Sequence, residues 1–175
     1  MTVDFLRLAA IGGLLLFIQV GFGSLLQIGG VRPDLLLIFS LMIAAGRGRQ
    51  AGLIAGWLSG LMQDAVSLSY LGVYALGRST AVFWTGIWLE RCEGQPKTWV
   101  WLVLFLISSF TQEAIVDIFY VQGTDLSYSS LLFRSAFPTA VYTALSGVLW
   151  VALPRPTGEK RKGLIVQKRS RRDLR

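Results

Sequence analysis

Apolar stretches almost free of charge alternate along the chain with short polar segments. The longest are Leu6–Leu26, Tyr70–Glu90, Trp99–Phe110 with its continuation toward Tyr120, and Phe137–Leu153. A helix needs about 20 mainly apolar residues to cross the roughly 30 Å hydrocarbon core of a bilayer. Each of these stretches reaches that length, alone or with its flanks, so the pattern predicts four membrane-spanning helices.

Two shorter apolar segments, Leu35–Gly46 and Ala51–Met62, lie between the first two of these stretches. Only the short segment Arg47–Gln50 separates them, so they are predicted to form the two spans of a helical hairpin. The expected fold class is therefore all-α, a polytopic membrane protein with about six transmembrane helices in residues 1–154. Residues 155–175 are expected to form a basic, disordered tail on the cytoplasmic side.

The positive charges give this arrangement a predicted orientation. Lys and Arg gather in the loop with Arg47 and Arg49, in the loop with Arg91 and Lys97, and in the tail, which holds nine of the chain's 17 Lys and Arg residues. Basic loops remain on the cytoplasmic side of a membrane. We therefore expect a multi-pass protein of the bacterial cytoplasmic (inner) membrane with both termini in the cytoplasm.

The basic tail raises the formal net charge of the chain to +7. In a soluble protein such a charge would suggest nucleic acid, but a polybasic segment that directly follows a span is better suited to anionic lipid headgroups. The same asymmetry is also a general topology signal. Both interpretations of the tail stay open, and no nucleic-acid partner is predicted.

The chain has few residues suited to catalysis. It contains no histidine and one cysteine, Cys92, which excludes Ser-His-Asp triads and His-ligated metal sites. Nucleotide-binding and nucleophile-elbow motifs are absent from the sequence. We therefore predict a non-enzymatic protein without cofactor or metal, and keep an intramembrane enzyme that uses Glu113 and Asp117 as a weak alternative.

Three ionisable residues fall within or beside the apolar stretches, where charges are costly and often functional. Glu113 and Asp117 are four residues apart and share one helix face, so they suit a proton or cation site. Alternatively this is the wetted outer end of the span, which we favour for Asp117 and leave open for Glu113. Arg78 lies too deep to reach water easily, and a carboxylate partner such as Asp64 or Glu113 is expected.

Glycines recur every four residues in the third predicted span, at Gly52, Gly56 and Gly60. On a helix they line one face, and such small-residue faces let two backbones approach closely in lipid. This face is expected to pack tightly against another helix, most simply one from the same chain, although a partner's span would also fit.

The middle of the chain combines three short motifs in a fixed order. A Pro-Asp-Leu opens the second span, a glycine-rich span closes on Gln-Asp, and a Leu-Gly pair follows. These residues are Pro33, Asp34 and Leu35, then Gly56, Gly60, Gln63 and Asp64, then Leu71 and Gly72. In this combination the chain resembles the bacterial rod-shape-determining MreD family.

The resemblance implies a bundle similar to the substrate-binding S components of energy-coupling-factor transporters. It also implies a component of the cell-elongation complex that organises lateral peptidoglycan synthesis. The implied partners are the bitopic membrane protein MreC and, through it, the actin-like MreB and a penicillin-binding transpeptidase. The likeness to S components supplies the alternative, a substrate-binding subunit of a vitamin-type transporter. A solute pocket needs polar groups that converge on the ligand, and the short outer loops are poor in polar groups, which argues against this alternative.

Physical roles can be assigned to the motif residues without the resemblance. Pro33 suits the first turn of a helix, and Asp34 beside it can accept that turn's free N–H groups. Asp64 ends the third span on the same side, so Asp34 and Asp64 are expected near each other at the outer mouth of the hairpin. Gly72 is expected in a turn or close approach as the next span begins.

Overall fold

The computed structural model describes residues 2–23, 25–67, 70–92, 96–122 and 127–153, and within this part helices account for all regular structure apart from one isolated β-bridge. The all-α prediction is thus confirmed. The basic tail and its predicted disorder lie outside the described residues. The elements are α1 (Thr2–Gly21), α2 (Leu35–Arg47), α3 (Arg49–Ser67), α4 (Val73–Arg91), α5 (Thr98–Val121), α6 (Tyr128–Leu131), the π-helical turn η1 (Leu132–Ala136) and α7 (Phe137–Ala152).

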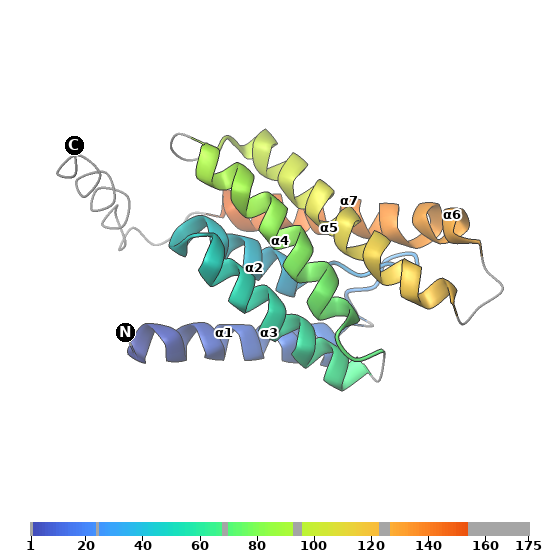
Figure 1. Cartoon of the computed structure of the whole chain (residues 1–175), viewed down its shortest axis with the longest axis horizontal. Helices are drawn as coiled ribbons and strands as arrows, with labels where there is room; N and C mark the ends of the chain where they lie inside the picture. The colour runs from blue at the N-terminus through green and yellow to red at the C-terminus, as the bar shows by residue number, and fades with distance from the viewer. Residues whose placement is uncertain (1, 24, 68–69, 93–95, 123–126, 154–175) are drawn as a thin grey trace.

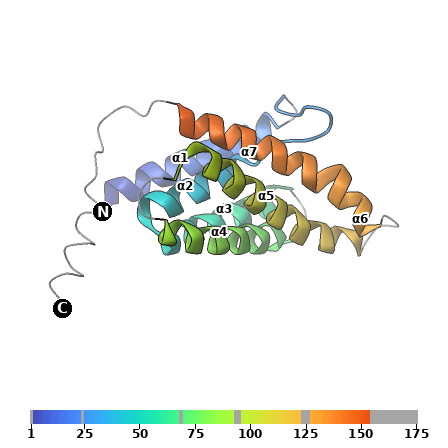
Figure 2. The ribbon, with the colours of Figure 1, turned by 90° about the horizontal axis from the view of Figure 1, so that it is seen from above.

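The long helices lie side by side along the long axis and alternate in direction (Figure 1). The last three elements form one continuous helical stretch, Tyr128–Ala152. The start of α1, the α2–α3 turn and the end of α7 gather at one end of the bundle, as Figures 1 and 2 both show. The end of α4 and the start of α5 lie at this end as well (Figure 1), so the helix ends that flank both predicted cytoplasmic loops are on the same side as the described ends of the chain.

Helix α2 lies at the centre of the bundle, against α1, α3, α4 and α7. The chain reaches it through a tight turn in which Ile28 and Val31 exchange backbone hydrogen bonds. Gly29 and Gly30 between them both have positive φ, which two-residue turns of this kind require. At its other end Gly48, with φ of 94°, reverses the chain directly into α3. The predicted hairpin is therefore a sharp helix–turn–helix.

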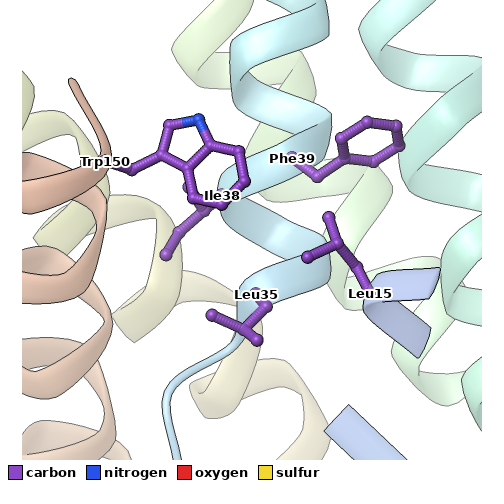
Figure 3. A pocket seen from close by; sticks show the side chains of 5 residues that line it. All are labelled: Leu15, Leu35, Ile38, Phe39 and Trp150. Carbon is purple, nitrogen blue, oxygen red and sulfur yellow. The ribbon is translucent and has the colours of Figure 1, made fainter. Parts of the chain in front are cut away.

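The apolar core lies between α2, α4, α5 and α7. Leu37 and Leu41 of α2 are fully buried beside Val82 of α4, and Phe105 of α5 stacks on Trp101 with ring centroids 5.3 Å apart. A smaller apolar contact joins α1, α2 and α7, where Leu15, Leu35, Ile38, Phe39 and Trp150 surround a space of only about 10 Å³ (Figure 3). Neither region offers polar groups for a ligand, so both serve packing.

The glycine-rich face of α3 packs within the chain. A side chain at Gly52 would collide with Ala44 of α2, and one at Gly60 would collide with the backbone at Ala75 of α4. Gly56 is less tight, because an added Cβ would lie 3.4 Å from the Val82 Cγ2, an ordinary contact. The face thus brings α3 close to both neighbours, as small-residue faces do in membrane helices, and is not free for a partner's span.

The outside of the bundle is apolar. Large hydrophobic side chains are exposed on five helices, for example Leu14 of α1, Trp57 of α3, Trp84 of α4, Ile107 of α5 and Leu149 of α7. Soluble monomers seldom expose large apolar patches, whereas here exposed large apolar side chains occur along most of the long helices. Among the described residues, Thr98–Val121 and Tyr128–Ala152 are long and apolar enough to cross a membrane by themselves. The outside is thus suited to lipid, while the inside is partly polar.

Candidate functional site

A buried arginine organises the polar interior. Arg78 of α4 has no exposed surface, and its Nη2 donates to the two carboxylate oxygens of Asp34 at 3.0 Å and 2.8 Å. The guanidinium also donates to Ser59 Oγ at 3.2 Å, to Gln63 Oε1 at 2.6 Å and to Gln112 Oε1 at 3.2 Å. We call these five residues, Asp34, Ser59, Gln63, Arg78 and Gln112, the Arg78 cluster.

Asp34 holds its place because it is also the N-cap of α2. Its carboxylate accepts a hydrogen bond from the Leu37 backbone N–H at 2.9 Å, which satisfies one of the free donors at the start of the helix. It accepts another from Gln112 Nε2 and a longer one, 3.4 Å, from Gln19 Nε2. The capping role predicted for Asp34 therefore holds. Pro33 differs from expectation, because it precedes the cap and lies outside the helix.

The outermost helices reach the cluster through Gln19 and Thr143. Gln19 of α1 donates to Gln63 Oε1 at 3.3 Å and accepts from the Leu36 backbone N–H at 3.2 Å. Thr143 of α7 accepts from the Asp34 backbone N–H at 3.0 Å. Asp34 stands at the start of α2, Ser59 and Gln63 on α3, Arg78 on α4 and Gln112 on α5. Each of the six long helical segments thus supplies at least one group to a single hydrogen-bonded network.

Such a network is expensive to break. Two buried charges are tolerated only when they pair and their remaining donors and acceptors are satisfied, and removal of one partner typically costs 3–5 kcal/mol. Here Arg78 is 0% exposed and Asp34 only 4%. Because one network touches all six segments, it fixes their relative register, whereas apolar contacts between the same helices would tolerate sliding. The cluster is therefore suited to holding one rigid arrangement of the bundle.

The ion pair corrects the sequence-based expectation for Arg78, whose partner is Asp34 rather than Asp64 or Glu113. Asp64 instead accepts hydrogen bonds at the start of α4, from the backbone N–H groups of Gly72 at 3.0 Å, Tyr74 at 3.1 Å and Ala75 at 3.2 Å. Gly72 turns into that helix with φ of 95°, in agreement with its predicted role. Asp64 thus stabilises the connection between α3 and α4. Its neighbour Gln63, and not Asp64, bonds to Arg78.

The second acidic pair, Glu113 and Asp117, lies next to the Arg78 cluster on α5. Glu113 accepts a weak hydrogen bond from Gln112 Nε2 at 3.4 Å. Asp117 is only 6% exposed, contrary to the expectation of a wetted helix end, because α6 and η1 fold back over this part of α5. Both carboxylates line a cavity of about 280 Å³. Among the described residues no group of three or more His, Cys, Asp or Glu could hold a metal ion.

The sequence singled out Asp34, Gln63 and Arg78 one by one but did not place them together. It missed Ser59 and Gln112 of the cluster, and also Gln19 and Thr143, which bond to it. Gln19 lies in an otherwise apolar stretch, and Gln112 directly precedes Glu113. An amide inside a predicted span is a usable signal, since buried amides must find partners. Ser59 and Thr143 give no such signal, because small hydroxyls bond readily to their own helix backbone.

An apolar exterior around a partly polar, hydrogen-bonded interior is typical of a helical membrane protein. Comparison with known families then shows which family of membrane proteins the chain belongs to. The family model of the rod shape-determining protein MreD matches residues 2–153, and the chain belongs to this family. Membership assigns it to the group of shape-determining components. No curated protein and no solved structure gives a significant match to the chain.

Proposed function

We propose that this protein is a non-enzymatic component of the cell-elongation complex in the bacterial inner membrane, where it helps organise lateral peptidoglycan synthesis. The observation that carries the proposal is the MreD family match over residues 2–153. The partners are an MreC-like bitopic protein and, through it, an MreB-like filament and a penicillin-binding transpeptidase. The basic tail, residues 155–175, adds contact with anionic lipid headgroups.

The proposed topology is six spans with both termini in the cytoplasm. It is supported by the basic loops, since Arg47, Arg49 and Arg91 stand at the end of the bundle where α1 starts and α7 ends. Helices α3 and α4 fit this scheme although they carry polar residues, because Ser59, Gln63 and Arg78 face the interior and are hydrogen-bonded there. Polar groups within spans are tolerated when they face the bundle and pair.

The internal network supports a scaffold rather than a moving carrier. Alternating access requires one part of a bundle to move against another. Here hydrogen bonds at Arg78 and Asp34 connect all six helical segments. Neither the family match nor this geometry favours the solute-transporter alternative. A rigid body with a lipid-facing exterior is suited to holding partner spans in a fixed arrangement.

The test is depletion with complementation in the native host. Depletion should turn elongated cells round and wide, and re-expression of the parent chain should restore both width and co-purification of an MreC-like protein from native membranes. The matched variants are Asp34→Asn, which breaks the network, and Glu90→Gln, which alters an exposed ion pair with Arg49 at 3.6 Å. Only Asp34→Asn should fail to complement. Normal cell width after full depletion would refute the proposal.

A further inference from the structure

The cavity beside Glu113 and Asp117 has the chemistry of a cation site. It lies between α4, α5 and the α6–η1 segment, and its polar lining consists of Glu113, Asp117, Ser135 and the side chains of Tyr74 and Tyr120. Its wall includes the π-helical turn η1, where Ser135 lies. Single π-helical turns are rare and occur frequently at functional sites, because they re-aim side chains within a helix.

The key group is the carboxylate of Asp117. This residue is 94% buried (6% exposed), yet its Oδ2 has no hydrogen-bond partner among the described residues. Glu113, one helical turn away on the same face, has within the described part of the chain only the weak bond from Gln112. The ion pairs of the described chain involve other carboxylates, those of Asp34 and Glu90. Buried acceptors are almost always satisfied, so a donor supplied from the cavity would complete the hydrogen bonding of Asp117 that the described residues leave open.

We propose that this cavity binds an organic ammonium group, held by the carboxylates of Asp117 and Glu113. Two carboxylates supply acceptors for ammonium N–H donors, and charge-assisted bonds of this kind are the strong ones. The rings of Tyr74 and Tyr120 stand in the same lining, and aromatic faces attract organic cations. A cavity of about 280 Å³ takes the ammonium together with the carbons attached to it, which a bare metal ion does not need.

The surroundings are suited to a ligand that arrives from the membrane. Phe133 of η1 and Phe137 of α7 are strongly exposed next to the cavity wall, and large apolar side chains there face lipid. The Tyr128 hydroxyl donates to the Ala114 carbonyl at 3.1 Å, which fastens α6 against α5 and keeps the wall in place. The ammonium can thus belong to a phospholipid headgroup such as ethanolamine, or to a small free amine, and the experiment separates these two sources.

The experiment uses the purified full-length protein in detergent and three phospholipids with identical acyl chains. Native mass spectrometry measures how much phosphatidylethanolamine, phosphatidylglycerol and phosphatidylcholine each protein retains. The glycerol headgroup lacks the ammonium, and the choline headgroup lacks N–H donors. In parallel, thermal unfolding is measured with free ethanolamine against sodium chloride of equal ionic strength. Because the basic tail is present in every sample, its attraction for anionic lipid cancels when variants are compared.

The variants are Asp117→Asn, Glu113→Gln and the control Glu90→Gln. The parent and the control should prefer phosphatidylethanolamine over the other two lipids. Asp117→Asn should weaken that preference tenfold or more, because it replaces a charge-assisted bond by a neutral one. The isosteric amide breaks no existing bond at Oδ2, so this variant should remain folded; Glu113→Gln provides an independent second variant.

The outcomes separate as follows. A lipid preference that both acidic-site variants weaken supports the site with a headgroup as ligand. Stabilisation by free ethanolamine that the same variants abolish, without lipid preference, supports the site with a free amine as ligand. The proposal is wrong if the parent discriminates neither lipids nor ethanolamine, or if both variants respond like the parent. None of these results bears on the role in rod shape, which rests on the family match.

Discussion

The buried ion pair gives the sharpest prediction. Asp34→Asn keeps the size of the side chain but leaves Arg78, which has no exposed surface, without a counter-charge among its described neighbours. Loss of one partner of a buried pair typically costs 3–5 kcal/mol, and whole domains are stable by only about 5–15 kcal/mol. We therefore expect the free energy of unfolding to fall by about 3–5 kcal/mol. The measurement is a denaturant titration of the full-length protein in micelles, followed by circular dichroism.

A double-mutant cycle shows whether the loss comes from the pair itself. Arg78→Met alone should lower the free energy of unfolding by a similar amount, because the buried Asp34 carboxylate then keeps neutral hydrogen-bond donors but loses the positive charge of the guanidinium. The double variant should cost no more than either single one, since no unpaired charge remains. Glu90→Gln is the matched control: its pair with Arg49 is exposed and should contribute at most about 1 kcal/mol. Single effects that add to within about 0.5 kcal/mol would refute the coupling.

Three further predictions follow from the packing, the capping and the charges. Gly60→Ala places a Cβ 2.6 Å from the backbone nitrogen of Ala75 and should lower stability by about 1–3 kcal/mol, measured by the same titration. Asp64→Ala removes the acceptor at the start of α4 and should cost roughly 2 kcal/mol; an unchanged midpoint would contradict the cap. In a Cys92→Ser background, an impermeant thiol reagent applied to spheroplasts should label Ser129→Cys and spare Gln50→Cys.

The glycine prediction has an internal control at the next turn of the same helix. Gly56→Ala adds a Cβ in ordinary contact with Val82, at 3.4 Å, and should be tolerated because nothing has to move. If Gly60→Ala and Gly56→Ala lower stability equally, the close approach of α3 to α4 is not what requires glycine.

For the topology, labelling of Gln50→Cys from outside would overturn the proposed orientation.

The sequence determined the helices because their signal is local. Runs of apolar residues mark the helical segments, and the short turn at Gly48 and the motif at Asp34 mark where two of them end and begin. The glycine face of α3 also followed from a four-residue spacing, which places residues on one side of any helix. Family membership was recognisable for the same reason, because its motifs are short and lie within single segments.

Partners across helices were decided only by the tertiary structure. Arg78 and Asp34 are 44 residues apart in the chain, and periodicity says which residues share one helix face but not which helices become neighbours. The same limit explains Asp117: its position near the end of α5 predicted contact with water, and only the return of α6 and η1 over that helix buries it. Local pattern therefore fixed the elements, whereas the assembly of the bundle fixed the charge pairs and the cavity.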